Sequence, residues 1–202
     1  MKPFWEESYA DAEHETFGAA SSEVVDLVGR LPPGARVLDA GCGDGRHALY
    51  LARAGFEVDA FDLSERGVAK LRQRAGSDGL NVTTWVQDLR TVQLAARYDL
   101  IVCHGVLHLL GRDERPGIVS HLQESTAIGG WNVVVAFTDR IPPPPDLAPF
   151  MTELFQEGEL ASLYDGWTME LSESYILHDE HPGGIRHRHA IDKVVARRRG
   201  EA

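Results

Sequence analysis

Hydrophobic and polar residues follow two different periods along this chain, and the two periods alternate from about residue 20 onward. Short apolar and β-branched runs predict strands at residues 36–40, 56–61, 82–86, 98–103 and 131–137, the last introduced by a Gly129-Gly130 turn. Apolar residues at helical spacing predict helices at residues 46–54, 64–74 and 113–124. Because strands and helices alternate, we expect an α/β fold in which helices cover both faces of a parallel sheet.

The pattern changes beyond the last of these strands. Consecutive prolines at residues 142–145 exclude a helix interior and a central strand, and they predict a stiff, extended loop over residues 139–149. A helix is predicted at residues 157–164, and two strand-like runs at 168–177 and 185–197 are joined by a Pro182-Gly183-Gly184 turn. We therefore expect a Rossmann-like, doubly wound, mostly parallel seven-stranded sheet that ends in a C-terminal antiparallel hairpin.

The length of the chain limits its domain organisation. With 202 residues it is long enough for one well-buried core and too short for two ordinary domains. We predict a single domain over residues 21–202, preceded by an N-terminal arm or lid over residues 1–20. This arm carries Trp5, Tyr9 and Phe17 among many acids, which is typical of a segment that packs over another part of the protein.

Charge and apolar runs exclude several classes of partner. The net charge of −11, from 20 basic and 31 acidic residues, disfavours binding to the phosphate backbone of a nucleic acid. No run approaches the ~18 apolar residues of a membrane span, and the N-terminus lacks the apolar segment of a secretory signal, so we expect a cytoplasmic protein without membrane contact. Cys42 and Cys103 form no CxxC pair, so neither a disulfide nor a thiolate metal site is expected.

The strongest local signal lies between the first predicted strand and the first predicted helix. There Asp39 is followed by three glycines at alternate positions, Gly41, Gly43 and Gly45. Glycines at such a place let the backbone turn tightly and approach a ligand closely. A nicotinamide dinucleotide is excluded, because its G-x-G-x-x-G pattern requires a glycine where this chain has Arg46.

Two further acids end the next predicted strands. Asp62 follows the second strand, where a carboxylate can accept hydrogen bonds from both ribose hydroxyls. Asp88 follows the third strand, where it can accept a hydrogen bond from the amino group of adenine. Three acids in this order predict an adenosine pocket rather than unrelated turn residues. The run D-A-G-C-G-D-G resembles the E/D-x-G-x-G-x-G motif of class I S-adenosyl-L-methionine-dependent methyltransferases. This resemblance implies that S-adenosyl-L-methionine is the cofactor, bound by Asp39, Gly41, Gly43, Gly45, Arg46, Asp62, Leu63, Asp88, Leu89, His104 and Gly105.

The chain also resembles one family more closely, the tellurite-resistance methyltransferases, over residues 22–198. The matching stretches are residues 43–52, 98–102, 129–132 and 157–160, together with Tyr164 and Trp167. This resemblance implies catalytic roles for His178 and Arg186 of the final hairpin. The chain departs from the family at Asp179, where those enzymes carry an arginine, and at residues 106–110, where theirs are more apolar.

Four histidines lie close together in the predicted hairpin: His178, His181, His187 and His189. His187 and His189 share one face of a strand, and together with His108 they are predicted to line the substrate site. Two other interpretations stay open. His181, His187 and His189 could ligate a divalent cation, although no metal is assigned, or the histidines could simply cover a charged hairpin. His178 could accept a proton from a nucleophile near neutral pH.

These patterns predict methyl transfer from S-adenosyl-L-methionine to a small molecule or an oxyanion. The acceptor could resemble tellurite or selenite, held by Arg186 and Arg188, or it could be a small thiol or phenol. A protein or nucleic-acid methyltransferase is disfavoured, because Cys103-His104-Gly105-Val106 replaces the Asn/Asp-Pro-Pro-aromatic signature. The alternative is a non-catalytic module that binds S-adenosyl-L-methionine or a metal through the histidine-rich hairpin. The sequence defines neither the acceptor nor the oligomeric state.

Overall fold

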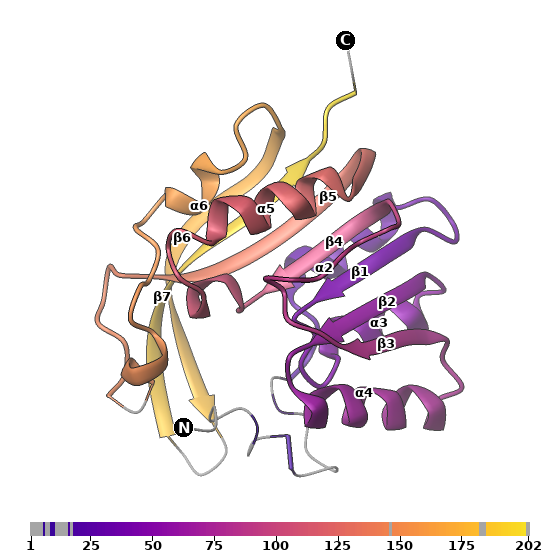
Figure 1. The fold of residues 1–202 in the computed structure, drawn as a ribbon, viewed down its shortest axis with the longest axis horizontal. Coiled ribbons are helices and arrows are strands. Elements are labelled where there is room, and N and C mark those ends of the chain that lie inside the picture. The colour runs from indigo at the N-terminus through magenta and orange to yellow at the C-terminus, as the bar shows by residue number, and fades with distance from the viewer. Residues whose placement is uncertain are drawn as a thin grey trace.

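A computed structural model describes residues 6, 9–10, 16, 18–145, 147–181 and 185–200, with backbone alone at 179–181 and 185–186. In this part of the chain seven strands form one sheet in the order β3-β2-β1-β4-β5-β7-β6 (Figure 1). The strands are β1 (Arg36–Ala40), β2 (Glu57–Asp62), β3 (Val82–Val86), β4 (Tyr98–His104), β5 (Thr126–Thr138), β6 (Thr168–His181) and β7 (Ile185–Arg197). Strands β1 to β5 are parallel, whereas β7 is antiparallel to β5 and β6, so the predicted fold class is confirmed.

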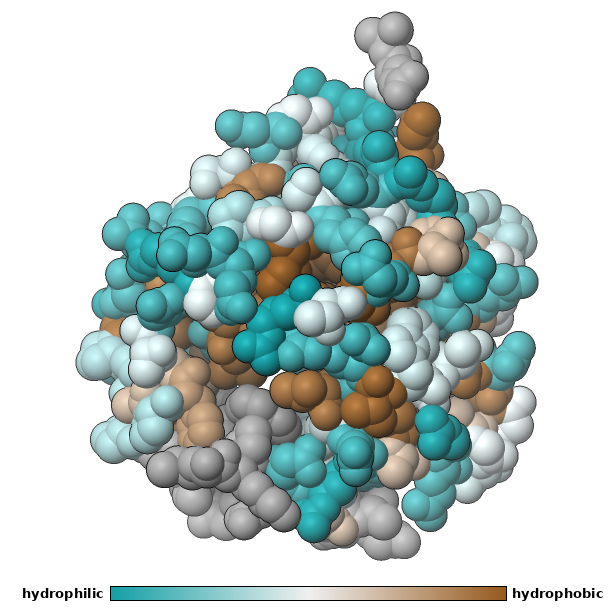
Figure 2. Space-filling model, in the orientation of Figure 1, coloured by the Kyte–Doolittle hydropathy of each residue, from teal (hydrophilic) through white to brown (hydrophobic). Residues whose placement is uncertain are grey.

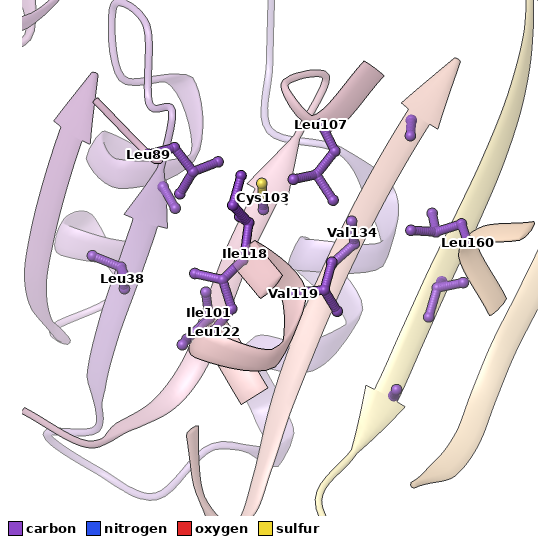
Figure 3. Packing of buried hydrophobic residues seen from close by; sticks show 14 of the residues in the cluster. Leu38, Leu89, Ile101, Cys103, Leu107, Ile118, Val119, Leu122, Val134 and Leu160 are labelled. Atoms are coloured by element: carbon purple, nitrogen blue, oxygen red, sulfur yellow. The ribbon is translucent and has the colours of Figure 1, made fainter. Parts of the chain in front are cut away.

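Helices cover both faces of the sheet, as the alternating pattern predicts. One face packs against α2 (Ser22–Leu27), α3 (Arg46–Arg53) and α4 (Glu65–Ser77), and the other against α5 (Arg115–Glu124) and α6 (Glu159–Ser162). Short 3-10 turns stand at η1 (Val28–Arg30), η2 (Leu107–Leu109) and η3 (Ala148–Phe150). Figure 3 shows Ile118 and Leu122 of α5 packed toward Ile101 of β4, which belong to the apolar cluster on one face of the sheet. A second apolar cluster lies on the other face.

Local sequence accounts for many of the element boundaries. The predicted limits of β1 and β3 are those observed, whereas the prediction for β2 is one residue early at both ends and that for β4 is one residue short at its C-terminal end. Ser64 precedes α4 and its hydroxyl oxygen accepts a hydrogen bond from the Gly67 amide at 3.0 Å. This contact satisfies an amide of the first helical turn that has no partner within the helix.

The predicted Gly129-Gly130 turn is wrong, because both glycines lie inside β5. Tyr98 of β4 pairs with Thr126 and Leu100 pairs with Trp131, so extra residues of β5 bulge out of the ladder between them. Gly129 has φ +78°, a conformation that glycine adopts without the steric cost of a side chain. The two glycines therefore permit a bulge within a long strand and do not reverse the chain.

The segment after β5 is also less regular than predicted. Within the loop predicted over residues 139–149, η3 begins at Ala148, and the helix predicted over residues 157–164 is confined to α6. Gly158 has φ +84° and starts this helix, and residues 163–166 form turns that end it. Leu160 and Tyr164 are both buried, although the helix is shorter than predicted.

The C-terminal hairpin extends beyond the rest of the sheet. β5 ends at Thr138, which pairs with Ala190, so β7 residues before Ala190 have β6 as their only paired strand among the described residues. Figure 1 shows the two strands projecting past the carboxyl end of β5. β6 continues to His181, four residues further than the predicted end at Leu177. The hairpin therefore stands beside the edge of the sheet where the parallel strands end.

A cavity of about 290 Å³ lies between α5 and the segment that connects β3 to β4. Leu89 and Val92 of the connection and Ile118 of α5 supply the apolar part of its lining, and Figure 2 shows apolar groups in a hollow on this face. Polar side chains supply the rest: Arg90, Gln93, Glu114 and His121. Residues 87–97, which are all described, form no helix, and Leu89 and Val92 of this connection pack on the core. Across the described residues we find no helix with the length and apolar character needed to cross a membrane.

Candidate functional site

The glycine-rich loop after β1 is held against β2. The amides of Gly41 and Cys42 both donate to the carbonyl oxygen of Phe61, at 2.8 and 2.9 Å. Gly41, Gly43 and Gly45 have φ values of +78°, +54° and +90°. A side chain at Gly45 would also collide with Leu71 of α4, so both the conformation and the space require glycine there.

Asp39, at the end of β1, ties the two ends of this loop together. Its buried carboxylate accepts a hydrogen bond from the Ala48 amide, in the first turn of α3, at 3.0 Å. Burial raises the pKa of Asp39 to about 7, because a charged carboxylate is poorly solvated there. The residue thus fixes where helix α3 begins relative to the loop.

Asp62, at the end of β2, holds the loop from its other side. One carboxylate oxygen accepts from the Gly43 amide at 2.8 Å, and the other accepts from the Ser64 amide at 2.8 Å. Burial raises the pKa of Asp62. Each oxygen retains a second acceptor site, so the same carboxylate can still receive the hydroxyl groups of a ligand.

Tyr9 brings part of the predicted N-terminal arm to this loop. Its side chain is 7% exposed, and its hydroxyl lies where a side chain on Gly43 would stand. Burial, with the nearby Asp62 and Asp44 carboxylates, raises the pKa of Tyr9 well above its ordinary value. Thr16 of the arm donates its amide to Asp44 at 3.0 Å. At these two described positions, the arm lies over the loop.

Asp88, beyond β3, is the third acid of the predicted pocket. It forms a paired contact with Arg90, whose guanidinium hydrogen bonds lower the pKa of the carboxylate. Leu63, next to Asp62, is 56% exposed, whereas Leu89 is 8% exposed. An exposed leucine beside two carboxylates offers an apolar surface for a purine ring next to acceptors for its polar groups.

The three acids end adjacent strands, because β3, β2 and β1 are neighbours in the sheet. Their carboxylates match the hydrogen-bond donors of adenosine: two ribose hydroxyls and the adenine amino group. The glycine-rich loop adds a backbone surface without side chains at the same edge. These residues fit the adenosyl part of the predicted cofactor, S-adenosyl-L-methionine.

His104, at the end of β4, belongs to a polar cluster on the sheet face covered by α2 and α3. Its Nδ1 atom lies 2.9 Å from Nη2 of Arg46, and its Nε2 atom lies 3.4 Å from Oε1 of Glu23. Nζ of Lys193 lies 2.9 Å from the other oxygen of Glu23. Burial lowers the pKa of His104 and lowers that of the neighbouring His47 to about 2. Gly105 follows His104 and its amide donates to the carbonyl of β5 at 2.8 Å.

His108 and His189 both stack on the ring of Phe137. The ring centroids lie 4.1 and 4.4 Å from that of Phe137, and the planes are within 16° of parallel. His108 accepts the Phe137 amide at Nδ1, and burial lowers its pKa to about 3. His187 meets His189 edge-on at 5.7 Å. The structure thus brings together the three histidines predicted to contact substrate, and His189 is too buried to be surface cover.

The predicted catalytic residues lie further along the hairpin. His178 is exposed on β6 and pairs with Arg188 of β7. The side chains of Arg186 and His181, and that of Asp179, lie outside the described residues. In the part of the chain with described side chains, no three His, Cys, Asp or Glu residues are placed to hold a metal ion.

Three residues of this region have no counterpart among the predicted site residues: Glu23, Lys193 and Phe137. Glu23 interrupts the apolar face that Val24 and Leu27 give to α2. Lys193 is buried on β7, and the residues two positions away on the same face, Ile191 and Val195, are apolar. A charge at an otherwise apolar position is a signal of a buried partner, but it does not identify that partner.

Comparison with known proteins gives consistent matches. A family model described as tellurite resistance protein TehB matches residues 4–186. The probable S-adenosyl-L-methionine-dependent methyltransferase TehB of Haemophilus influenzae strain 10810 is 34% identical over 185 residues, covering 90% of this chain and 63% of that protein. The crystal structure of TehB from Haemophilus influenzae has a TM-score of 0.81 and 31% identity, covering 93% of this chain and 65% of that one.

A more distant structure shares the fold alone. Magnesium protoporphyrin IX methyltransferase from Synechocystis PCC 6803, solved with bound S-adenosylhomocysteine, has a TM-score of 0.66 and 21% identity, covering 96% of this chain and 92% of that one. The chain spans about two-thirds of the length of the Haemophilus relatives. The predicted fold and the predicted family resemblance are confirmed. The Haemophilus relatives are named as S-adenosyl-L-methionine-dependent, in agreement with the predicted cofactor. The family match over most of the chain and the identity to its members show that this protein belongs to the TehB family of tellurite resistance proteins.

Proposed function

We propose that this protein is a methyltransferase that transfers a methyl group from S-adenosyl-L-methionine to a small molecule. The observation that carries the proposal is the set of three acids, Asp39, Asp62 and Asp88, at the carboxyl ends of adjacent strands around a glycine-rich loop. Open α/β sheets bind ligands at this edge. The cofactor, when bound, supplies a methyl group that is already activated on a sulfonium.

The residues of this chain then bind and orient the two reactants. Asp62 would accept the ribose hydroxyls, Asp88 the adenine amino group, and Asp39 would keep the loop in place. His104 and Gly105, at the end of β4, would border the methyl group. Such orientation can account for about 7 to 11 kcal/mol of a barrier, which is more than a single proton-transfer group contributes.

The acceptor would lie beside the ends of β4, β5 and β7. His108, His187 and His189 form a continuous ring contact through Phe137 in this region, and His178 and Arg186 extend it along the hairpin. Two acceptor classes suit these residues: an oxyanion such as tellurite or selenite, or a small thiol or phenol. The first class includes the tellurite that the family description names, and the second class contains acceptors that carry a proton.

Two measurements on the full chain test the proposal. The first is calorimetric titration of metal-stripped protein with S-adenosyl-L-methionine and S-adenosylhomocysteine, repeated with added zinc, nickel or copper. The second is formation of S-adenosylhomocysteine with tellurite, selenite, thiols and phenols as acceptors. Binding without metal, followed by turnover, supports the enzyme. Binding without any turnover supports the non-catalytic alternative, and binding that requires a metal would favour the histidine hairpin as a metal site.

A further inference from the structure

The polar cluster around His104 places charged groups where burial is costly. Glu23 is 5% exposed and Lys193 is 9% exposed, and both face the sheet side covered by α2 and α3. Two buried ions lose their hydration, and well-packed apolar residues of similar size often stabilise a fold as much or more. Stability alone therefore does not explain this pair.

The strand register shows where the pair acts. His104 of β4 pairs with Val135 of β5, and Val135 pairs with Lys193 of β7, so these three residues form one row across the sheet. Residues in one row project from the same face. The row lies at the carboxyl end of β4, beside the loop that ends at Gly45. Glu23 and Lys193 thus support the one histidine of this row.

The contacts of His104 indicate where its ring proton lies. Nη2 of Arg46 lies 2.9 Å from Nδ1 and 3.4 Å from Nε2, and since a guanidinium can only donate, the shorter contact favours a lone pair on Nδ1 and a proton on Nε2. Nε2 faces Oε1 of Glu23, a buried oxygen that has no aligned hydrogen bond in the described part of the chain. Arg46 is partly exposed, so rotation of its side chain would uncover Nδ1. In this tautomer the protonated nitrogen lies 3.4 Å from a carboxylate oxygen, and the other nitrogen can accept a proton once Arg46 has moved.

We propose that His104 accepts the proton of the methyl acceptor, that Glu23 and Lys193 are its positioning residues, and that the acceptor carries an un-ionised hydroxyl or thiol. The inference rests on the proposed methyltransferase function. As the acceptor atom forms its bond to the methyl carbon, the methyl–sulfur bond breaks and its electron pair stays on sulfur. The proton of the acceptor moves to Nδ1, and the Glu23 carboxylate stabilises the resulting imidazolium. An oxyanion that accepts the methyl group on the lone pair of its chalcogen atom does not need to lose a proton to this group.

The charges around His104 come from three elements. Glu23 of α2 favours a protonated ring, whereas Arg46 of α3 and Lys193 of β7 oppose it, and His47 of α3 stays neutral beside it at a centroid distance of 5.0 Å. Burial lowers the pKa of His104, so the ring is neutral and able to accept a proton at neutral pH. His178 on the exposed hairpin is the competing proton acceptor, and the experiment must separate the two.

The test compares acceptors that differ in ionisation. Full-length protein is saturated with S-adenosyl-L-methionine at about pH 8, where para-nitrophenol is ionised and para-cresol is not. A thiol pair, nitrothiophenol and mercaptoethanol, serves in the same way. His104→Gln should lower kcat by about 100- to 10,000-fold on the un-ionised member of each pair and by less than about tenfold on the ionised member. The matched control His121→Gln, on α5 of the sheet face opposite His104, should leave both rates unchanged.

The pH–rate profile of Glu23→Gln gives a second test, because a purely structural role of Glu23 would not shift this profile. The substitution should shift the ascending limb of the pH–rate profile to lower pH, since the imidazolium loses its carboxylate, while the Kd for the cofactor stays the same. If His104→Gln failed to fold, the pH–rate profiles of Glu23→Gln and His104→Asn would be used instead.

Three outcomes would overturn the inference alone: equal loss by His104→Gln on both members of a pair, selective loss by His178→Gln instead, or wild-type turnover of selenite or tellurite only. Wild-type protein that binds the cofactor but methylates nothing would overturn the proposed function as well.

Discussion

Replacing Asp62 with alanine should weaken S-adenosyl-L-methionine binding by about 10- to 150-fold. In the proposed complex the carboxylate accepts ribose hydroxyls, and a hydrogen bond to a charged group contributes about 1.5 to 3 kcal/mol. Since about 1.4 kcal/mol corresponds to a tenfold change in Kd, loss of one such bond gives this range. The measurement is calorimetric titration of wild type and variant under the same buffer and temperature.

The structure adds a second consequence that the assay must control. Asp62 also accepts the amides of Gly43 and Ser64, so Asp62→Ala leaves two donors without their partner, at about 1 to 3 kcal/mol for each donor that water cannot reach. Urea unfolding should therefore accompany the titration. Asp78→Ala removes a surface carboxylate that pairs with Arg53 and should not change cofactor binding. If the folded Asp62→Ala protein binds the cofactor within about threefold of wild type, the ribose role of Asp62 is refuted.

Three further predictions concern stability, each measured by urea unfolding. Gly45→Ala should destabilise the protein by about 1 to 3 kcal/mol, and by more than Gly79→Ala, because both glycines have positive φ but only a side chain at position 45 meets a neighbour; equal losses would contradict this. Asp39 has a folded pKa of about 7, above its unfolded value, so its stability contribution is present at low pH and lost as pH rises through 7, and Asp39→Asn should gain on wild type between pH 5 and 8; a constant difference would be inconsistent with that pKa. Lys193→Met should cost about 3 to 5 kcal/mol, because Glu23 stays buried without its cation, and the double variant Glu23→Leu/Lys193→Met should cost less.

The cofactor half of the site could be predicted from sequence because its signals are local. Asp39 and Asp62 lie in the last residues of short strands and Asp88 lies two residues beyond a third, and the parallel order of those strands brings their ends to one edge of the sheet. No contact between distant segments had to be known for this step. The same locality explains why β1 and β3 have their predicted limits, whereas the two glycines of β5 misled the prediction: a glycine pair fits a turn and a bulge equally well.

The acceptor half could not be assembled in this way, because its contacts join segments far apart in the chain. Glu23 meets Lys193 only when α2 packs on the strand row that begins at His104, and the rings of His108 and His189 meet only through Phe137. The residue types were visible in sequence, and the histidines were singled out. Their partners were not, since a buried charge or ring shows that it needs a partner without showing which one.

The proposed cofactor contacts and the proposed acceptor contacts lie largely on different strands, and this limits which properties of TehB proteins can be inferred for this chain. The ends of β1, β2 and β3 carry most of the proposed cofactor contacts, with His104 and Gly105 at the end of β4, and the match to TehB proteins extends through these strands. The departures from the family, Asp179 and residues 106–110, lie instead beside β4 and on the hairpin. A fold and a cofactor are shared by enzymes with many acceptors, and the acceptor depends on the groups that face it. The tellurite description therefore supports the cofactor chemistry more strongly than the acceptor. His104, held between Glu23 and Arg46, is the group through which this chain's own acceptor can be tested.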